Sequence, residues 1–538
     1  MIQTYKPIKA LKTLVLIIFS HILLGCNSSQ IPYVTTPKIH HTNTEHTTLG
    51  MKAKKIQGSR ISDSTVYLVS EGTEAFLIRM ALLRLAEHSV DLQYFVWKSD
   101  LIGKMLFHNI LLAADRGVQV RILLDDITLD TKTKKILYAL AQHKHIEVRI
   151  YNPISTNKIR ALGALFSVKR INRRMHNKSF TADGQYTIVG GRNIETNYFT
   201  ADIKSNYADL DLVSVGPIVK KVNTQFNIYW NSGIAIPVKL FKDNKHNIDT
   251  LSAARKKLND FVYKNKNSVY TLEVKQSKMY TRIINDIDGV KKDKLYKGKA
   301  TIVYDDPQKT LGKTKEETVY LTTLMQPYID KVQHSLDLIS PYFVPGSRGI
   351  KNLADMVKRG IKIRVITNSL SSTDGYMAQS GYARHRLALL KAGVELYELK
   401  AEAKTEVSHL LKQSAKTRNA LHAKIYIFDK KEVYIGSFNI DPRSANLNTE
   451  LGIVCTMPNM AAYIAKTLFD ENIKYETYKV VLVKKDILIN KQTIPRGTIV
   501  WIETLGDKKI YHTTQPQTTT WQRFNEKIYS LLPIESQL

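Results

Sequence analysis

Two halves of the chain carry the same succession of short sequence patterns, offset by about 245 residues. The pattern "DLQYFVW" at 91–97 returns as "DLISPYFVP" at 337–345, and "RGVQVRILLDD" at 116–126 returns as "RGIKIRVITNS" at 359–369. Solenoid repeats are far shorter, about 20 to 50 residues. The chain is therefore expected to contain a duplicated domain, with two halves that fold alike.

Helix and strand patterns alternate within each half. In the first half, "EAFLIRMALLRLAEHS" and "GKMLFHNILLAADRG" have apolar residues at helical spacing, and each precedes an apolar strand-like run such as "VQVRILLDD". Strands that alternate with helices of this length predict an α/β fold. Each half is expected to be a mixed sheet flanked by helices.

These patterns place the first half at residues 59–235 and the second at 301–455. The segment 236–300 is rich in lysine and biased toward helix, and we expect it to connect the halves. The stretch 456–538 is expected to begin as a helix and to continue as a short β addition, because "KVVLVKK" and "TIVWIETL" have strand character. We assign it no separate activity.

The N-terminus has the features of an export signal. Three lysines precede the apolar run "LVLIIFSHILLG", which is short for a membrane-spanning helix. Its end, Leu23-Leu24-Gly25-Cys26, resembles the bacterial lipoprotein box, although Leu24 is a less common residue there. Residues 1–26 are therefore expected to be a signal peptide whose Cys26 receives lipid, with an uncleaved anchor helix as the alternative. Residues 27–58 are polar and are expected to be a tether.

Lipidation of Cys26 would leave Cys455 as the only other cysteine, so no intramolecular disulfide is expected despite export. Cys455 lies in the apolar run "LGIVCTM" and is expected in the core. The protein is expected to be anchored to a membrane and to face the periplasm. The residue after Cys26 is Asn27, not the aspartate that is associated with inner-membrane retention in some bacteria. The choice between inner and outer membrane therefore stays open.

The chain is strongly basic, with a formal net charge of +31 and a pI near 9.7. This charge favours anionic partners such as phospholipid head groups or nucleic acid. The lysines are spread along the chain, however, so a generally basic and solvated surface explains the charge equally well.

A histidine and a lysine two residues apart occur in both halves, in "MHNKSF" at 175–180 and "LHAKIY" at 421–426. In an extended strand, residues two apart project from the same face, so each His-Lys pair is expected to point together. In the second copy, Ala423, Ile425 and Ile427 would take the opposite, core-facing side. A turn at Asp183-Gly184, and another at Asp429, then makes each motif the first strand of a hairpin.

The returning strand of each hairpin ends in small residues and an asparagine, in "GGRN" at 190–193 and "GSFN" at 436–439. Small residues allow close approach of the backbone to a ligand, and amide and ammonium groups donate hydrogen bonds to phosphate oxygens. The candidate phosphate-binding residues are Asn193, Ser437 and Asn439.

His-x-Lys-x4-Asp followed by Gly-Ser-x-Asn resembles the signature of the phospholipase D superfamily. The resemblance implies two α/β halves packed face to face around one shared active site. Gly191 departs from the pattern, because it stands where the family has serine. Longer stretches, among them "RRMHNKSFTADGQYTIVGGRNI" and "GSFNIDPRSANLNTELGIV", resemble the bacterial C-type cardiolipin synthases and their relatives. The catalytic residues implied by the motifs are His176, Lys178, Asp183, His422, Lys424 and Asp429.

The resemblance implies a reaction through a phosphohistidine, with one histidine as nucleophile and the other as general acid and base. By analogy, His176 is assigned as nucleophile and His422 as acid/base, and the reverse stays open. Asp209 and Glu450, at corresponding places downstream of the motifs, are candidates to orient the histidines, and Asp211 competes with Asp209.

Other chemistries fit the sequence less well. Lysines and asparagines can neutralise a phosphodiester, so neither metal nor cofactor is expected. No Gly-x-Ser-x-Gly elbow is present, and His143 and His145 are explained by a polar loop. The turn positions of Asp183 and Asp429 favour a structural role over proton transfer.

We therefore expect a phosphatidyltransferase that makes cardiolipin from phosphatidylglycerol and a second phospholipid, with phosphatidylethanolamine as a candidate donor. A phospholipase D or a nuclease that uses water on the same histidines is the alternative, because the motifs are shared. A lipid-binding protein without catalysis is less consistent with two complete motifs. The expected partners are anionic and zwitterionic phospholipids and a membrane surface, without obligatory nucleic acid; an accessory protein stays open.

Overall fold

The computed structural model describes residues 43–154, 171–241, 249–283, 294–312, 319–402, 417–489 and 492–532. The expected signal peptide, the lipidation site Cys26 and the first part of the expected tether lie outside these residues. Within the described part of the chain, no helix is long and apolar enough to cross a membrane.

The first half is an eight-stranded mixed sheet in the order β9-β4-β3-β2-β5-β6-β8-β1, with β2, β3 and β4 parallel. Its elements in chain order are β1 (Ser64–Val69), α3 (Gly72–Leu85), β2 (Ser89–Tyr94), α4 (Leu101–Asp115), β3 (Gln119–Asp125), α5 (Thr131–Leu140), β4 (Ile146–Tyr151), β5 (Ser179–Ala182), β6 (Tyr186–Gly190), β8 (Asp211–Val215), α8 (Pro217–Trp230) and β9 (Ala235–Pro237).

The second half repeats this order strand by strand, as β18-β13-β12-β11-β15-β16-β17-β10. Its elements are β10 (Leu295–Tyr304), α12 (Leu321–Asp330), β11 (Ser335–Ile339), α13 (Gly346–Lys358), β12 (Lys362–Asn368), α14 (Tyr376–Lys391), β13 (Glu395–Leu399), β15 (Ile425–Phe428), β16 (Glu432–Gly436), β17 (Leu451–Thr456), α16 (Pro458–Ala465) and β18 (Thr477–Leu482). The expectation of two similar mixed α/β halves is confirmed.

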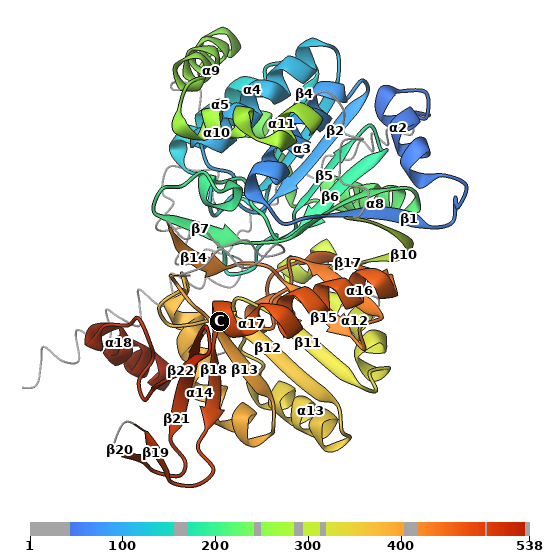
Figure 1. Ribbon diagram of the computed structural model, residues 1–538. Helices are drawn as coiled ribbons and strands as arrows, with labels where there is room; N and C mark the ends of the chain where they lie inside the picture. Colours follow the sequence, from blue (N-terminus) through green and yellow to red (C-terminus); the bar gives the residue numbers. More distant parts are fainter. Residues whose placement is uncertain are drawn as a thin grey trace, which may run out of the picture. The chain divides into compact units, whose positions relative to one another are not determined.

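The two halves share one continuous sheet and one of the hydrophobic core clusters. β1 pairs with β10 in antiparallel fashion, with Ser64 opposite Gly298 and Tyr67 opposite Leu295. Side chains alternate across β1, so that Tyr67 packs under α3 and α4, while Val66 joins a cluster that contains residues of α8, α16 and β15. Figure 1 shows these elements, the first half in blue and green and the second in yellow to red. The second cluster holds apolar side chains of both halves, so each half is stabilised by the other.

A buried ion pair recurs at the same place in each sheet. Arg121 on β3 binds Asp91 on β2 through Nε at 2.7 Å, and Arg364 on β12 binds Asp337 on β11 at 2.6 Å. In both halves the two residues are register partners on neighbouring parallel strands. The repeated arginine and aspartate of the sequence patterns thus stabilise the centre of each sheet.

Helices of the connecting segment cover the first half. α9 (Leu251–Asn265) packs on α4 and α5, and α11 (Lys278–Ile283) packs on α3, with α10 (Val269–Gln276) between them in the chain. The described part of the segment contains these three helices, in line with its composition, but β10 begins at Leu295, inside the range 236–300 predicted for the connection. That strand belongs to the second half, because it pairs with β17 as well as β1.

The end of the expected tether is a helix. α2 (Thr48–Gln57) starts with a cap in which the Thr47 hydroxyl accepts a hydrogen bond from Gly50 N at 3.0 Å. Leu49 and Ala53 are buried against the first half, and Ile56 packs beside them. These three residues are spaced four and three apart, so they lie on one face of the helix. The polar composition of the whole segment conceals this apolar face. This part of the segment is therefore not a tether.

The first elements after residue 456 complete the second half, and the later ones have no counterpart in the first half. α16 corresponds to α8, and β18 pairs with β13 as β9 pairs with β4. The added elements are β19 (Ile487–Ile489), β20 (Gln492–Ile494), β21 (Ile499–Leu505), β22 (Lys508–His512) and α18 (Thr520–Leu531). β21 and β22 extend the sheet beyond β18.

Both motif hairpins form, and the motif aspartates fix their turns. Asp183 accepts hydrogen bonds from the backbone amides of Glu87, His88 and Ser89 at 2.8 to 3.0 Å, and Asp429 accepts three from Gln333, His334 and Ser335 at 2.7 to 2.9 Å. These amides lie just before and at the first residue of β2 and β11. Each carboxylate therefore ties a turn to the start of a central strand, which supports the structural role over the catalytic one.

We predict that replacing the fully buried Asp183 with alanine lowers the free energy of unfolding by roughly 2 to 3 kcal/mol, because three part-buried amides lose a charged acceptor. Thermal unfolding followed by circular dichroism measures the change. Asp183→Asn is the matched control, since asparagine tolerates the positive φ of 49° and keeps one acceptor oxygen. Equal melting of Asp183→Ala and the unchanged protein would contradict this role.

Candidate active site

Both motif histidines lie in short extended segments just before the hairpin strands, and not within those strands as the alternation argument assumed. His176 precedes β5, and its backbone N–H donates to Thr449 O of the second half at 2.8 Å. His422 precedes β15, and its N–H donates to Ala208 O of the first half at 2.9 Å. The backbone of each histidine is thus held by the opposite half, which brings the two motifs to one place.

The residue before each histidine is fixed by a polar side chain at the end of a parallel strand. Asp125, at the end of β3, accepts from Met175 N and from Arg174 Nε, both at 2.9 Å. Asn368, at the end of β12, accepts from Leu421 N at 2.8 Å and donates to Leu421 O at 3.0 Å. Asp125 and Asn368 occupy corresponding positions in the two sequence repeats, but the sequence pattern did not indicate a function for either residue.

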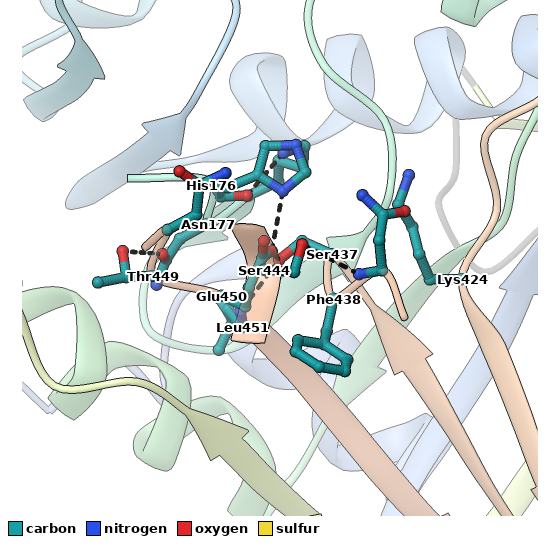
Figure 2. A network of polar contacts seen from close by, with 12 residues as sticks. His176, Asn177, Lys424, Ser437, Phe438, Ser444, Thr449, Glu450 and Leu451 are labelled. Atoms are coloured by element: carbon teal, nitrogen blue, oxygen red, sulfur yellow. Dashed lines mark hydrogen bonds and ion pairs between the residues drawn. The ribbon is translucent and has the colours of Figure 1, made fainter. Parts of the chain in front are cut away.

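Each imidazole is bound by a carboxylate from the other half. His176 Nδ1 lies 2.8 Å from Glu450 Oε2, and His422 Nδ1 lies 2.7 Å from Asp209 Oδ2. Both carboxylates are inaccessible to solvent. Figure 2 shows His176 and Glu450 with Ser437 beside them. Asp211 does not compete for this role, because it accepts from Arg79 Nη2 at 2.9 Å.

Electrostatics fix the tautomer of both rings. Burial raises the pKa of Glu450 and of Asp209, but the adjoining histidine and the nearby cations outweigh burial and hold both pKa values below their ordinary range. Burial lowers the pKa of His176 to about 4 and also lowers that of His422. Each ring is therefore neutral at pH 7, with its proton on Nδ1 toward the carboxylate and a lone pair on Nε2.

The two motif lysines are buried cations without a carboxylate partner. Lys178 Nζ donates to His176 O at 2.6 Å and Lys424 Nζ to His422 O at 2.5 Å, and within the described ranges neither ammonium has a carboxylate within ion-pair distance. Burial lowers the pKa of Lys178 to about 7 and that of Lys424 to about 8. Buried charge is costly unless it is paired, so this arrangement favours an anionic ligand.

The three candidate phosphate-binding residues have different surroundings. Asn193 uses its side chain within the protein, accepting from Val96 N at 3.2 Å and donating to Tyr198 Oη at 2.9 Å. Ser437 Oγ donates to Glu450 Oε2 at 2.5 Å and accepts from Leu451 N at 3.0 Å. Asn439 is buried with an amide oxygen that has no partner among the described residues. Of the three, Asn439 has the polar atom best placed to respond to a ligand.

Gly191 makes room for Asp209. A Cβ added at Gly191 would lie 2.3 Å from Asp209 Oδ1. In the second half the Ser437 hydroxyl links Glu450 to Leu451 N, whereas in the first half Leu210 N donates directly to Asp209 Oδ1 at 2.8 Å. The shorter acid and the glycine compensate for the missing serine, so each carboxylate is still held, but by different groups.

Sequence reasoning missed Tyr198, which contacts the second histidine. Its hydroxyl lies 3.3 Å from His422 Nε2, and the two rings meet edge to face with centroids 4.9 Å apart. Burial holds the pKa of Tyr198 well above its usual value, so the hydroxyl stays neutral and can donate to the ring or accept from it. Tyr198 lies in "NIETNYF", where nothing in the spacing indicates a site residue.

Among the described residues, no group of three or more histidine, cysteine or acidic side chains could hold a metal ion. His143 lies away from the site and contacts Asp115 at 3.2 Å. Cys455 is buried in the core of the second half, and burial raises the pKa of its thiol to about 12.

Comparisons with known proteins agree with this geometry. The family model described as "Cardiolipin synthase, PLD-like domain" matches residues 80–230 and 325–471, which are corresponding parts of the two halves. Cardiolipin synthase C of Escherichia coli (strain K12) is 36% identical over 475 residues, covering 87% of this chain and 95% of that protein. An uncharacterized protein of Helicobacter pylori is 32% identical over 449 residues, covering 80% of this chain and 85% of that protein.

A solved structure shares the fold. The crystal structure of phosphatidylserine synthase from Haemophilus influenzae matches 80% of this chain and 91% of that chain, with a TM-score of 0.50 and 13% sequence identity.

We predict that both site imidazoles are neutral at pH 7, carry their proton on Nδ1, and protonate only in more acidic solution, because burial holds both pKa values below the ordinary value. Long-range ¹H–¹⁵N spectra of ¹⁵N-histidine-labelled protein distinguish the two ring nitrogens. His176→Gln and His422→Gln assign the signals. Two protonated nitrogens on either ring at pH 7 would contradict the arrangement.

Proposed function

The chain belongs to the family of phospholipase D-like cardiolipin synthases, and from that premise we propose that it is a phosphatidyltransferase that makes cardiolipin. Phosphatidylglycerol is the acceptor, and a second phospholipid, with phosphatidylethanolamine as candidate, is the donor of the phosphatidyl group. The observation that carries this proposal is the pairing of two neutral, carboxylate-bound imidazoles with two buried lysines that have no carboxylate partner among the described residues.

In the first step, the lone pair of His176 Nε2 attacks the phosphorus of the donor. A P–N bond forms, the P–O bond to the head group breaks, and protonated His422 gives its Nε2 proton to the departing oxygen. Lys178 and Lys424 stabilise the negative charge that spreads over the phosphoryl oxygens. The anionic donor also favours protonation of His422, whose imidazolium is stabilised by Asp209.

In the second step, neutral His422 accepts the proton of a phosphatidylglycerol hydroxyl as its oxygen attacks the phosphorus. The P–O bond to the acceptor forms, the P–N bond breaks, and His176 is regenerated with its lone pair. Glu450 keeps the proton of His176 on Nδ1 throughout, so that the attacking nitrogen stays available.

The assignment of His176 as nucleophile rests on the environment of the two Nε2 atoms. Among the described residues, no hydrogen bond reaches His176 Nε2, whereas His422 Nε2 lies 3.3 Å from the Tyr198 hydroxyl. A free lone pair suits a nucleophile, and a hydroxyl contact suits a group that exchanges protons.

We also propose that the enzyme is exported and held at the membrane by lipid on Cys26. The apolar N-terminal run and the sequence around Cys26 support this. A Cys26→Ser variant that retains full lipid labelling in cells would contradict the anchor.

We predict that purified protein in mixed micelles converts labelled phosphatidylglycerol to cardiolipin, and that added phosphatidylethanolamine increases the yield if it is the donor. His176→Ala should abolish the reaction because it removes the nucleophile. His422→Ala should lower the rate by about 10²- to 10⁴-fold because it removes proton transfer. Thin-layer chromatography of the products measures both, and His143→Ala is the matched control outside the site.

The alternatives give different products in the same assay. Phosphatidic acid without cardiolipin would identify a phospholipase D. Absence of lipid turnover, combined with cleavage of DNA that depends on both histidines, would identify a nuclease.

A further inference from the structure

The C-terminal helix α18 turns its apolar side to the solvent. Trp521, Phe524, Ile528 and Leu531 are 66%, 51%, 43% and 78% exposed. Residues spaced three, four and three apart lie on one face of a helix, so these side chains form one continuous strip, which we call the α18 strip. The rings of Trp521 and Phe524 stack with centroids 5.6 Å apart.

The opposite side of α18 is polar, and this side packs against the protein. Glu526 is the one buried residue within α18, and its carboxylate lies 3.8 Å from Arg386 on α14. Gln522 Nε2 donates to Tyr376 Oη at 3.2 Å, and Arg384 Nη2 donates to Leu532 O at 2.9 Å. The usual orientation of an amphipathic surface helix is therefore reversed.

The reversal is built into a well-formed helix. Thr519 and Gln522 form a reciprocal capping box at its start, and three polar contacts fix it to α14. A frayed terminal segment would expose apolar residues by accident, but a capped helix fixed through its polar side presents them in a defined direction. Contiguous exposed apolar surface of this kind marks an interaction site, whereas single exposed residues do not.

We propose that the α18 strip docks into the surface of a phospholipid bilayer and holds the active site against the membrane. This inference rests on the proposed function, because the bilayer is the source of both substrates. Tryptophan and phenylalanine on an amphipathic helix are the side chains that enter the boundary between head groups and acyl chains.

Positive charge next to the strip complements an anionic membrane. Lys527 is exposed on α18 itself. Just beyond Arg386, which lies near Glu526 of α18, helix α14 contributes Leu387 and Lys391 to a groove that Lys484 and Arg496 also line. Among the described residues, no acidic side chain lines this groove. Apolar residues with adjacent cations suit a surface that carries phosphatidylglycerol.

The strip is connected to the His422 side of the active site. Tyr376, which binds Gln522 of α18, begins α14. Two residues earlier, Asp374 accepts hydrogen bonds from Tyr207 and Tyr342, both at 2.8 Å, and the Tyr207 ring lies 5.4 Å from that of His422. Docking through α18 would therefore bring lipid to the side of the site at which the acceptor hydroxyl loses its proton.

Trp521 reports on docking without a label, because the other three tryptophans, Trp97, Trp230 and Trp501, are buried. We expect vesicles of phosphatidylglycerol and phosphatidylethanolamine to shift the emission of the full-length protein to the blue, to protect it from iodide, and to quench it when the acyl chains are brominated. Trp521→Phe should remove this response.

Two double variants with substitutions at exposed apolar residues distinguish vesicle binding through the α18 strip from nonspecific adsorption to lipid. The double variant Phe524→Gln/Ile528→Gln should weaken vesicle binding by at least about tenfold, since affinity scales with buried apolar area. Tyr263→Gln/Val269→Gln, which changes similarly exposed residues of α9 and α10, should bind as the unchanged protein does. All of these variants should keep their activity toward lipid dispersed in detergent.

Three outcomes would overturn the proposal. Trp521 could stay open to iodide in the presence of vesicles, the control pair could weaken binding as much as the strip variant, or protection could rise with protein concentration without lipid, which would assign the strip to a second copy of the chain. Failure of the proposed function would appear separately, as embedded Trp521 without cardiolipin in the detergent assay.

Discussion

The hydrogen bonds that cross from the histidine of one half to the carboxylate of the other are the interactions on which the rest of this structure depends. His176 relies on Glu450 and His422 on Asp209, and the backbone of each histidine also donates to the opposite half. A single half would therefore contain a histidine without its acid. This explains why the shared core and the β1–β10 pairing matter for chemistry as well as for stability, since they hold the two halves at the separation that the bonds require.

The second constraint is electrostatic. Lys178 and Lys424 are buried without carboxylate partners, and the available acids, Glu450 and Asp209, are engaged by the imidazoles. The site therefore contains two buried ammonium groups that contact no carboxylate among the described residues, and an anionic phosphodiester can offset the cost of burying them. Both imidazoles stay neutral chiefly because burial lowers their pKa values, which leaves a lone pair on Nε2 of His176 ready for attack.

Much of this arrangement could be predicted from the sequence. The repeat implied two similar α/β halves, and the hairpins at Asp183 and Asp429 follow from residues that tolerate left-handed turns. The crossed pairing could not be predicted, because spacing along the chain does not say which half a carboxylate will face. Tyr198 was missed since its contact with His422 depends on tertiary structure alone. The helix α2 was missed because average polarity concealed an apolar face, and the reversal of α18 could not be foreseen because periodicity does not say which face packs on the protein.

The central claim is that the two motifs form one site with one nucleophile, and the number of covalent adducts on a single chain tests it most directly. The enzyme would be mixed with the candidate donor phosphatidylethanolamine, quenched in base, which preserves a phosphohistidine, and analysed as intact protein and as peptides by mass spectrometry. The account predicts at most one phosphatidyl group per chain, attached to His176. Two groups on one chain, at His176 and His422 together, would show two independent sites and would contradict it.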